Sequence, residues 1–218
     1  MLEPVTGCCA RHGQEEFFGV KSAQRDAARY RAKGADAMAR SLARRAARRG
    51  VDGATVLEIG GGVGQVALEL LKGGAATAEV VELLPAYEPF VRELATEAGV
   101  GGRISFRTAD VVTDPEAWAP ADLVVLNKVV CCTPDGVELA GIAAGLARRT
   151  LVLSFPRRTW WVRAGFAAVN LYLRLRGRRF RVFVHPHTAL ADAVAAEGLS
   201  PSSAKNGPLF RIAAFERV

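Results

Sequence analysis

Apolar residues along this chain recur in two alternating patterns. Short runs that are apolar almost throughout, such as 122–127, are typical of strands buried on both faces of a parallel sheet. Between these runs the apolar positions follow a period of three to four residues, as they do in amphipathic helices. The alternation predicts an α/β fold with a mostly parallel sheet and helices on both faces.

The predicted strands can be placed by residue number. They cover 55–59, 78–83, 103–108, 122–127, 150–155 and 209–217. The predicted helices of the second half cover 137–148, 160–175 and 188–197, and a turn-rich link covers 201–207. Two further helices are expected before the first strand, with Ser22 and Asp36 as N-caps and Gly34 as the break between them.

The first predicted strand ends in a dense run of glycines, and a helical pattern follows. Glycine permits positive φ and close approach of a ligand to the backbone, and the helix start offers free N–H groups. Two cofactors compete for this turn. The residues Gly62, Gly64 and Ala67 fit the G-x-G-x-x-A pattern of NAD(P)-binding oxidoreductases. However, Glu58 precedes Gly60 by two residues, and a carboxylate there suits an ammonium group and repels a pyrophosphate.

An acidic residue followed by alternating glycines resembles the first motif of the class I S-adenosylmethionine-dependent methyltransferases. Glu82 lies at the tip of the next strand. Its distance along the sequence from the glycine turn is close to the roughly 20 residues that separate this turn from a ribose-binding acid in such folds. Asp110, after the third strand, is similar to the family's adenine contact. The resemblance covers about residues 50–155 by motif. It implies a Rossmann-like, seven-stranded sheet, S-adenosyl-L-methionine as the cofactor and S-adenosyl-L-homocysteine as the product.

The resemblance also implies a set of cofactor-binding residues around one crevice at the carboxyl ends of the strands. They are Glu58, Gly60, Gly61, Gly62, Gly64, Glu82, Leu83, Asp110, Val111 and Asn127.

Two adjacent cysteines, Cys131 and Cys132, follow the fourth strand, where many small-molecule methyltransferases carry two histidines. The overall layout is similar to the magnesium-protoporphyrin O-methyltransferases, although Cys132, Thr133 and Pro134 stand where that subfamily has His, an aromatic residue and Pro. A sizeable, apolar or aromatic acceptor is therefore expected. Vicinal thiols also suit arsenic(III), as in arsenite methyltransferases, and small buried side chains lining the cofactor site are a third interpretation.

Residues 157–187 form an insertion after the fifth strand, rich in arginine and without any acidic residue. The methyltransferase resemblance predicts a helical lid over the acceptor here. An ordinary packed helix and a helix on a membrane surface, through 157–181, are the alternatives, because basic helices flanked by tryptophans suit anionic interfaces. Trp160 and Trp161 are predicted to contact the acceptor, together with the two cysteines.

A general base helps methylation of a phenol, amine or thiol. The candidates are His185 and His187, which follow the lid, and also Tyr30 and His12. The sequence contains no Tyr-x-x-x-Lys pair or comparable group of hydride-transfer residues, which disfavours the alternative function of a nicotinamide-dependent oxidoreductase.

Size and charge narrow the class of protein further. The chain has 218 residues and a net charge of +7, mostly from arginine. We expect an N-terminal leader and helical cap over 1–49 and a methyltransferase domain over 50–218.

No nucleic-acid module accompanies the basic residues, and no signal peptide or membrane-spanning run is found. The pairs Cys8–Cys9 and Cys131–Cys132 lack zinc-site spacing, so no metal is expected. The prediction is a cytoplasmic enzyme that is a monomer or homodimer, with peripheral membrane contact as the alternative location.

Overall fold

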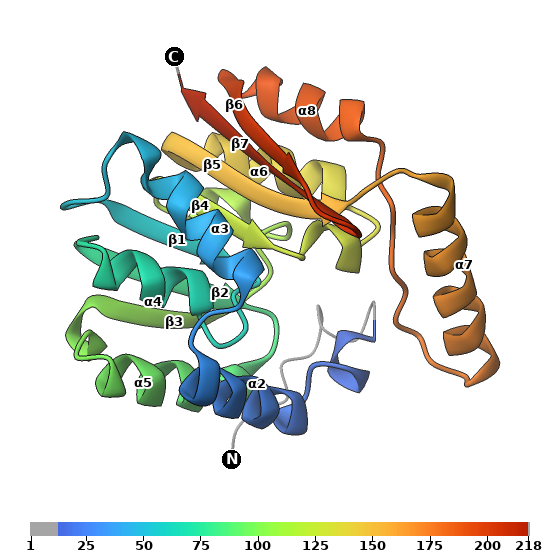
Figure 1. Cartoon of the computed structure of the whole chain (residues 1–218), viewed down its shortest axis with the longest axis horizontal. Coiled ribbons are helices and arrows are strands. Elements are labelled where there is room, and N and C mark those ends of the chain that lie inside the picture. The colour runs from blue at the N-terminus through green and yellow to red at the C-terminus, as the bar shows by residue number, and fades with distance from the viewer. Residues whose placement is uncertain (1–12, 218) are drawn as a thin grey trace.

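The computed structural model describes residues 13–217, and within them a seven-stranded sheet lies between two layers of helices (Figure 1). Cys8, Cys9 and His12 lie outside the described residues. The strands are β1 (Thr55–Ile59), β2 (Thr77–Glu82), β3 (Ile104–Thr108), β4 (Ala121–Asn127), β5 (Ala147–Pro156), β6 (Leu199–Asn206) and β7 (Phe210–Arg217). Their order across the sheet is β3-β2-β1-β4-β5-β7-β6, and β7 runs antiparallel to both of its neighbours. The predicted mostly parallel, Rossmann-like sheet is confirmed.

Helices connect most of the strands. They are α2 (Val20–Lys33), α3 (Ala37–Ala46), α4 (Gln65–Lys72), α5 (Glu88–Glu97), α6 (Gly136–Gly145), α7 (Trp160–Leu175) and α8 (His187–Ala196). Short 3-10 turns add η1 (Gln14–Glu16), η2 (Ala47–Arg49), η3 (Pro85–Tyr87), η4 (Gly101–Arg103), η5 (Pro115–Ala117) and η6 (Val130–Cys132).

Alternate residues of the central strands face two separate apolar clusters. Val56 of β1 packs with α2 to α5 on one face, whereas Leu57 packs with α6 and α8 on the other. The N-terminal helices α2 and α3 therefore share a core with the sheet. Burial on both faces explains the near-continuous apolar runs of the central strands.

The position of strand β6 was not predicted. Residues 201–207 were expected to be a turn-rich link, but 199–206 form β6, which pairs with β7 and makes the outer edge of the sheet. Most of β6 is exposed, so its sequence shows no apolar alternation. A polar edge strand is held by backbone hydrogen bonds, and Pro201, which has no N–H, is tolerated there.

Two helix boundaries also differ from the prediction. Helix α2 begins at Val20 with Gly19 as its N-cap, so Ser22 lies inside the first turn instead of capping it. The helix predicted to reach residue 148 ends at Gly145, because β5 starts at Ala147 and extends the pairing with β4. The other two signals are confirmed: the Asp36 side chain accepts a hydrogen bond from Ala39 N, and Gly34 ends α2 with φ 67°.

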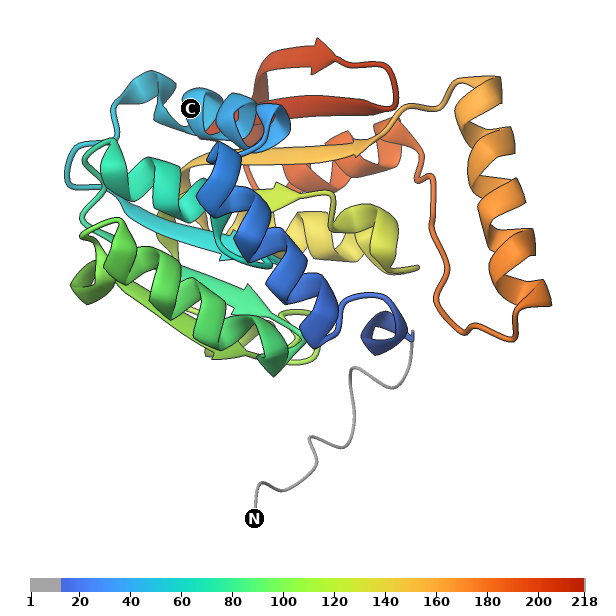
Figure 2. The ribbon, with the colours of Figure 1, turned by 60° about the horizontal axis from the view of Figure 1, so that its bottom comes forward.

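The insertion after β5 stands at one side of the molecule in both views (Figures 1 and 2). Helix α7 runs along this side, and the chain comes back through residues 176–186, here named the return segment. The Asn170 side chain ties the two together, because its amide donates to Val182 O at 2.7 Å and accepts from Val182 N at 2.9 Å. Within the described residues, no helix combines the length and the hydropathy needed to span a bilayer.

Candidate functional site

A cavity of about 480 Å³ opens at the carboxyl ends of β1, β2 and β4. One side of it, here named the strand side, is formed by the glycine turn and the strand tips. The other, the cap side, is formed by residues between Gln14 and Asp36 and by the insertion after β5. This position, at the carboxyl ends of the strands and at the topological switch point of the sheet, is usual for ligand sites in open α/β sheets.

The glycine turn makes the floor of the strand side. Gly60, Gly62 and Gly64 have φ values of 63°, 55° and 72°, in the left-handed region that favours glycine. A Cβ on Gly60 would lie 2.5 Å from a methyl group of Val129. The backbone between Glu58 and Gly64 is thus open to a ligand on one side and packed on the other. Gly60, Gly61 and Gly62 line the cavity, whereas Gly64 starts α4.

Glu58 is 1% exposed, and its carboxylate also holds the start of α4. Its oxygens accept hydrogen bonds from Ala67 N at 2.7 Å and Val66 N at 3.4 Å. Burial raises the pKa of Glu58 to about 7, and the nearby Glu82 carboxylate adds to the rise, although the two N–H groups oppose it. Glu58 lines the cavity, as predicted, and fixes the glycine turn against the helix.

Glu82 lies at the tip of β2 and bridges the glycine turn to the next loop. One oxygen accepts from Gly62 N at 3.0 Å and the other from Leu83 N at 2.8 Å. Burial raises its pKa, opposed by these backbone hydrogen bonds. An ionised carboxylate has about four acceptor positions, so the Glu82 carboxylate keeps capacity for a hydroxyl group of a ligand.

The remaining predicted cofactor residues lie around the same cavity. Leu83, Asp110, Val111 and Asn127 all line it. Asp110 accepts a hydrogen bond from Val112 N at 3.0 Å, which orients the carboxylate after β3. The Asn127 side-chain oxygen accepts from the Ser154 hydroxyl at 3.2 Å. The fold therefore places these four residues around one cavity, where the sequence predicts them.

Cys131 and Cys132 also line the cavity, with their sulfur atoms 3.8 Å apart. Both thiols lie 3.3 Å from the carbonyl oxygen of Lys128. The contact with Cys132 and the positive charge of Lys128 lower the pKa of Cys131, whereas the same contact and burial raise the pKa of Cys132. Among the described residues, no group of three His, Cys, Asp or Glu side chains is arranged to hold a metal ion.

Lys128 is a functional candidate that the sequence prediction missed. It has φ 62°, a strained conformation for a residue with a side chain, and such strain concentrates at functional sites. Its ammonium lies 3.3 Å from an oxygen of Asp36, so β4 and the N-terminal cap meet across the cavity. Burial opposes ionisation of Asp36, but the hydrogen bond from Ala39 N and the charge of Lys128 outweigh it and lower the pKa.

The cap side carries an aromatic wall that was also missed. Its members come from four separate segments of the chain: Phe18, Phe166, Phe180 and Phe210. Phe180 of the return segment packs against Phe17 and Phe18, with ring centroids 5.0 and 5.6 Å apart. No local pattern marks these residues, because only the fold brings them together.

The two candidate histidines do not line the cavity within the described structure. His185 Nε2 lies 3.1 Å from Thr133 O, and His187 Nε2 lies 2.9 Å from Pro156 O. His187 also packs edge-on against Phe155. Each ring therefore fixes the path of the chain after the return segment, and the geometry does not support the predicted role as a base.

Tyr30 faces away from the cavity. Its hydroxyl donates to Glu69 at 3.2 Å and accepts from Lys72 at 2.9 Å, which joins α2 to α4. Burial raises its pKa, although Lys72 opposes the rise, so the phenolate is disfavoured.

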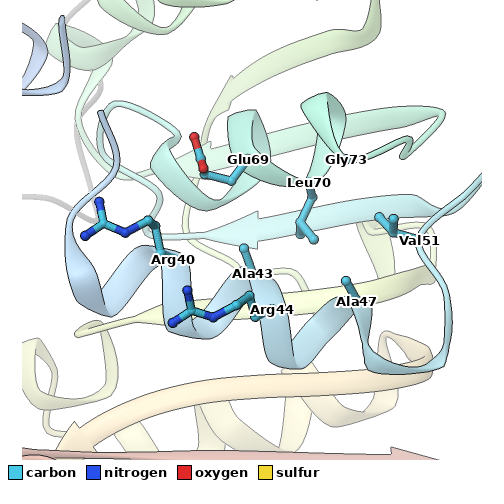
Figure 3. A pocket seen from close by; sticks show the side chains of 8 residues that line it. All are labelled: Arg40, Ala43, Arg44, Ala47, Val51, Glu69, Leu70 and Gly73. Atoms are coloured by element: carbon cyan, nitrogen blue, oxygen red, sulfur yellow. The ribbon is translucent and has the colours of Figure 1, made fainter. Parts of the chain in front are cut away.

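Glu69 lines a shallower depression of about 220 Å³ between α3 and α4, where Arg40 and Arg44 lie opposite it (Figure 3). That depression contains no glycine-turn residue.

The tryptophans of α7 do not reach the cavity either. Trp160 is 81% exposed and Trp161 is 40% exposed, and neither is among the lining residues. The insertion instead lines the cavity through Phe166, Phe180 and Val182. The predicted contribution of this segment to the site is supported, but by side chains other than the tryptophans.

The residues of the strand side fit the cofactor that the sequence predicts. Added side chains at the glycine turn would close the cradle: a Cβ on Gly61 would meet Val80 at 2.7 Å and Glu58 at 3.0 Å. Burial raises the pKa of Glu58 and of Glu82 in the ligand-free protein, and a bound sulfonium or ammonium group would favour the ionised form of both side chains. The ionised carboxylates would repel a pyrophosphate.

Comparisons with known proteins identify the fold. No family model and no curated protein sequence matches the chain. Among solved structures, magnesium protoporphyrin IX methyltransferase from Synechocystis PCC 6803, with bound S-adenosylhomocysteine, is similar over 91% of this chain and 83% of its own, with 19% identity and a TM-score of 0.63. An O-methyltransferase family protein from Burkholderia thailandensis is similar over 95% of this chain and 63% of its own, with 20% identity and a TM-score of 0.70.

A geranyl diphosphate methyltransferase in complex with S-adenosylmethionine is a third similar structure, over 84% of this chain and 85% of its own, with 15% identity and a TM-score of 0.64. At such identities the likeness concerns the fold. The chain has the fold of the class I S-adenosylmethionine-dependent methyltransferases, as the sequence predicts.

Proposed function

We propose that this chain is an S-adenosylmethionine-dependent methyltransferase that methylates an oxygen, nitrogen or sulfur atom of a small apolar or aromatic acceptor. One observation carries the proposal: a single cavity joins the glycine turn and Glu82 to the aromatic wall of the cap side. Solved structures of the same fold, with bound S-adenosylmethionine or S-adenosylhomocysteine, support it.

In this proposal the strand side holds the cofactor. Glu82 would accept hydrogen bonds from the ribose hydroxyls, Asp110 and Val111 would contact the adenine, and the glycine turn with Asn127 would surround the amino-acid end. When bound, the cofactor would supply a methyl group on a positively charged sulfur, for in-line transfer to the acceptor atom. Glu58 keeps the turn in the receiving conformation through its hydrogen bonds to α4.

The protein's own contribution is mainly alignment and exclusion of water. The aromatic wall and the insertion after β5 enclose the acceptor, so its nucleophilic atom is held opposite the strand side. Lys128 and Asp36 lie between the two sides and can orient a polar group of the acceptor. The cavity has a buried thiol at Cys131, whose pKa is lowered, and carboxylates but no lining histidine among the described residues, so deprotonation of the acceptor would use one of these groups or water.

A trivalent arsenical is the second candidate acceptor. It is favoured by the pair of thiols in the cavity, 3.8 Å apart, because soft arsenic(III) prefers thiolate ligands. The absence of a third His, Cys, Asp or Glu ligand nearby, within the described residues, favours an organic acceptor instead.

Transfer of a labelled methyl group tests the proposal. The purified protein is incubated with methyl-labelled S-adenosylmethionine and separate sets of phenols, amines, thiols and arsenite, and formation of S-adenosylhomocysteine is measured. Product with aromatic or apolar acceptors, and none with arsenite, supports the organic acceptor. Product with arsenite alone, lost in a Cys131→Ser/Cys132→Ser variant, would replace it by the arsenical. Cofactor binding without product in any set would leave a binding protein and contradict the proposed activity.

Three partner predictions belong to the same proposal. An apolar acceptor partitions into lipid, so a peripheral membrane contact through residues 157–181 would bring the enzyme to its substrate. The protein is expected to act as a monomer or homodimer and to bind no nucleic acid.

A further inference from the structure

Helix α7 has two apolar faces, and its own protein covers one of them. Val162, Phe166 and Leu173 point inward, toward the return segment and the cavity. The opposite face carries exposed apolar residues at intervals of three or four positions, as on one side of a helix. They are Trp160, Ala164, Ala168, Leu171 and Leu175. Trp160 and Leu175, at the two ends, are 81% and 77% exposed.

A helix that is apolar on both sides is normally buried on both sides. Here the outer stripe faces away from the sheet, and α7 stands at the edge of the molecule in both views (Figures 1 and 2). Isolated exposed apolar residues are common, but a continuous stripe along a whole helix marks an interaction surface.

The charges around this stripe indicate its partner. Between Glu138 and Asp192 the sequence contains no acidic residue. Exposed arginines flank the stripe at its start, along one edge and at its end: Arg158, Arg163, Arg174, Arg176, Arg178 and Arg179. Within residues 13–217, none of their guanidinium groups pairs with a carboxylate. A second copy docked symmetrically on the same stripe would bring these arginines together, and the repulsion opposes it.

We propose that the outer face of α7 binds the surface of an anionic lipid bilayer, with the helix lying flat in the interface. Tryptophan and leucine enter the boundary between headgroups and acyl chains, and the arginines contact anionic headgroups. Each basic residue near such a surface adds to the binding free energy.

This orientation gives the insertion a second use, which rests on the proposed methyl transfer. The inner face of α7 contributes Phe166 to the cavity wall, and the return segment contributes Phe180 and Val182. A bilayer bound on the outer face is therefore one helix away from the aromatic wall. An apolar acceptor dissolved in the bilayer enters the cavity beside α7 without crossing water.

Vesicle binding tests this inference. The full chain is mixed with vesicles of phosphatidylcholine alone, or of equal parts phosphatidylcholine and phosphatidylserine, and the bound fraction is measured by co-sedimentation. Binding is expected with the anionic vesicles only and is expected to fall as salt is added. The emission of Trp160 and Trp161 should shift to shorter wavelength, whereas Trp118 is already buried.

Matched variants locate the surface. Trp160→Gln/Leu175→Gln is expected to weaken vesicle binding at least fivefold, whereas Val20→Gln, an exposed apolar residue on α2, is expected to leave it unchanged. Arg174→Gln/Arg178→Gln is expected to weaken it at least threefold, and Arg48→Gln, an exposed arginine in η2, to change it little. Affinity for S-adenosylhomocysteine, measured in parallel, is expected to stay the same in all of them.

Three results would overturn the inference. The first is no binding to anionic vesicles by a protein that binds the cofactor. The second is equal weakening by Val20→Gln and by the α7 variant. The third is a dimer in size-exclusion chromatography that Trp160→Gln/Leu175→Gln converts to monomer, which would assign the face to self-association. Vesicle binding by a protein without cofactor affinity would support the docking surface and contradict only the proposed methyl transfer.

Discussion

The strand side and the cap side of the cavity are built in different ways. The strand side consists of strand tips and one tight turn, whose polar groups are held by backbone hydrogen bonds, as Glu82 is by Gly62 and Leu83. The cap side takes its lining from the N-terminal helices, α7 and the return segment, and contacts between side chains hold these together. A rigid strand side suits one constant cofactor, and a composite cap side suits an acceptor that differs among proteins of this fold.

The largest expected effect concerns the strand side. In Gly60→Ala, the new methyl group meets Val129 at a residue with φ 63°, so the turn must move. Cofactor affinity, measured by calorimetry, is expected to fall at least a hundredfold, about 2.7 kcal/mol. Gly53→Ala is the control, because Gly53 has φ 69° but no atom within 4 Å of the added Cβ. Similar losses in both variants would mean that backbone strain, and not the shape of the site, sets affinity.

A second effect concerns the buried carboxylate of Glu58. Its pKa is about 7 in the folded protein, against 4.5 for the ordinary side chain. The folded state therefore keeps the proton longer than the unfolded chain, and its stability falls as pH rises between these two values. Between pH 5 and pH 8 the cofactor-free protein is expected to lose about 2 kcal/mol of unfolding free energy through this group.

Glu58→Gln should remove that part of the pH dependence. Urea unfolding of the variant and of the unchanged protein, at both pH values, gives the comparison. The same difference between the two proteins at pH 5 and pH 8 would show that Glu58 ionises normally in the fold.

Glu82 gives the third prediction. Glu82→Ala is expected to weaken S-adenosylhomocysteine binding at least tenfold, about 1.4 kcal/mol, because the ribose hydroxyls lose their acceptor. Glu79→Ala is a matched control on the same strand, since Glu79 pairs with Arg107 at the surface and does not line the cavity. Unchanged affinity in Glu82→Ala would remove this residue from the ribose site.

The smallest effect is expected for Tyr30. Loss of its hydroxyl in Tyr30→Phe removes the hydrogen bonds to Glu69 and Lys72 and should lower the unfolding free energy by about 1 kcal/mol. Cofactor affinity and methyl transfer are expected to persist. Tyr172→Phe, exposed on α7, is the control and should change neither. A stable Tyr30→Phe protein without activity would restore Tyr30 as a catalytic residue.

The same contrast explains how far the sequence could predict the structure. The strand side depends on local signals: glycines that require positive φ, and acidic residues at the ends of apolar runs. Glu58, Glu82, Asp110 and Asn127 were therefore expected around one crevice, and all line the cavity. The polar edge strand β6 escaped prediction, because backbone pairing with β7, and not side-chain burial, defines it.

The cap side depends on long-range contacts that no sequence pattern reveals. Phe18 and Phe180 meet across most of the length of the chain, and Lys128 reaches Asp36 from another element. The histidines and tryptophans were predicted there because of their chemistry and position in the chain. The fold directs His185 and His187 to backbone carbonyls, and it leaves Trp160 on the outer face of α7.

Calorimetric titration of the purified chain with S-adenosylmethionine, S-adenosylhomocysteine and NADH, in parallel, tests the central claim most directly. We expect micromolar binding of the two sulfur compounds, one per chain, and no binding of NADH, because two carboxylates at the glycine turn disfavour a pyrophosphate. Binding of NADH alone would contradict the account and make the chain a nicotinamide-dependent protein with a methyltransferase-like fold.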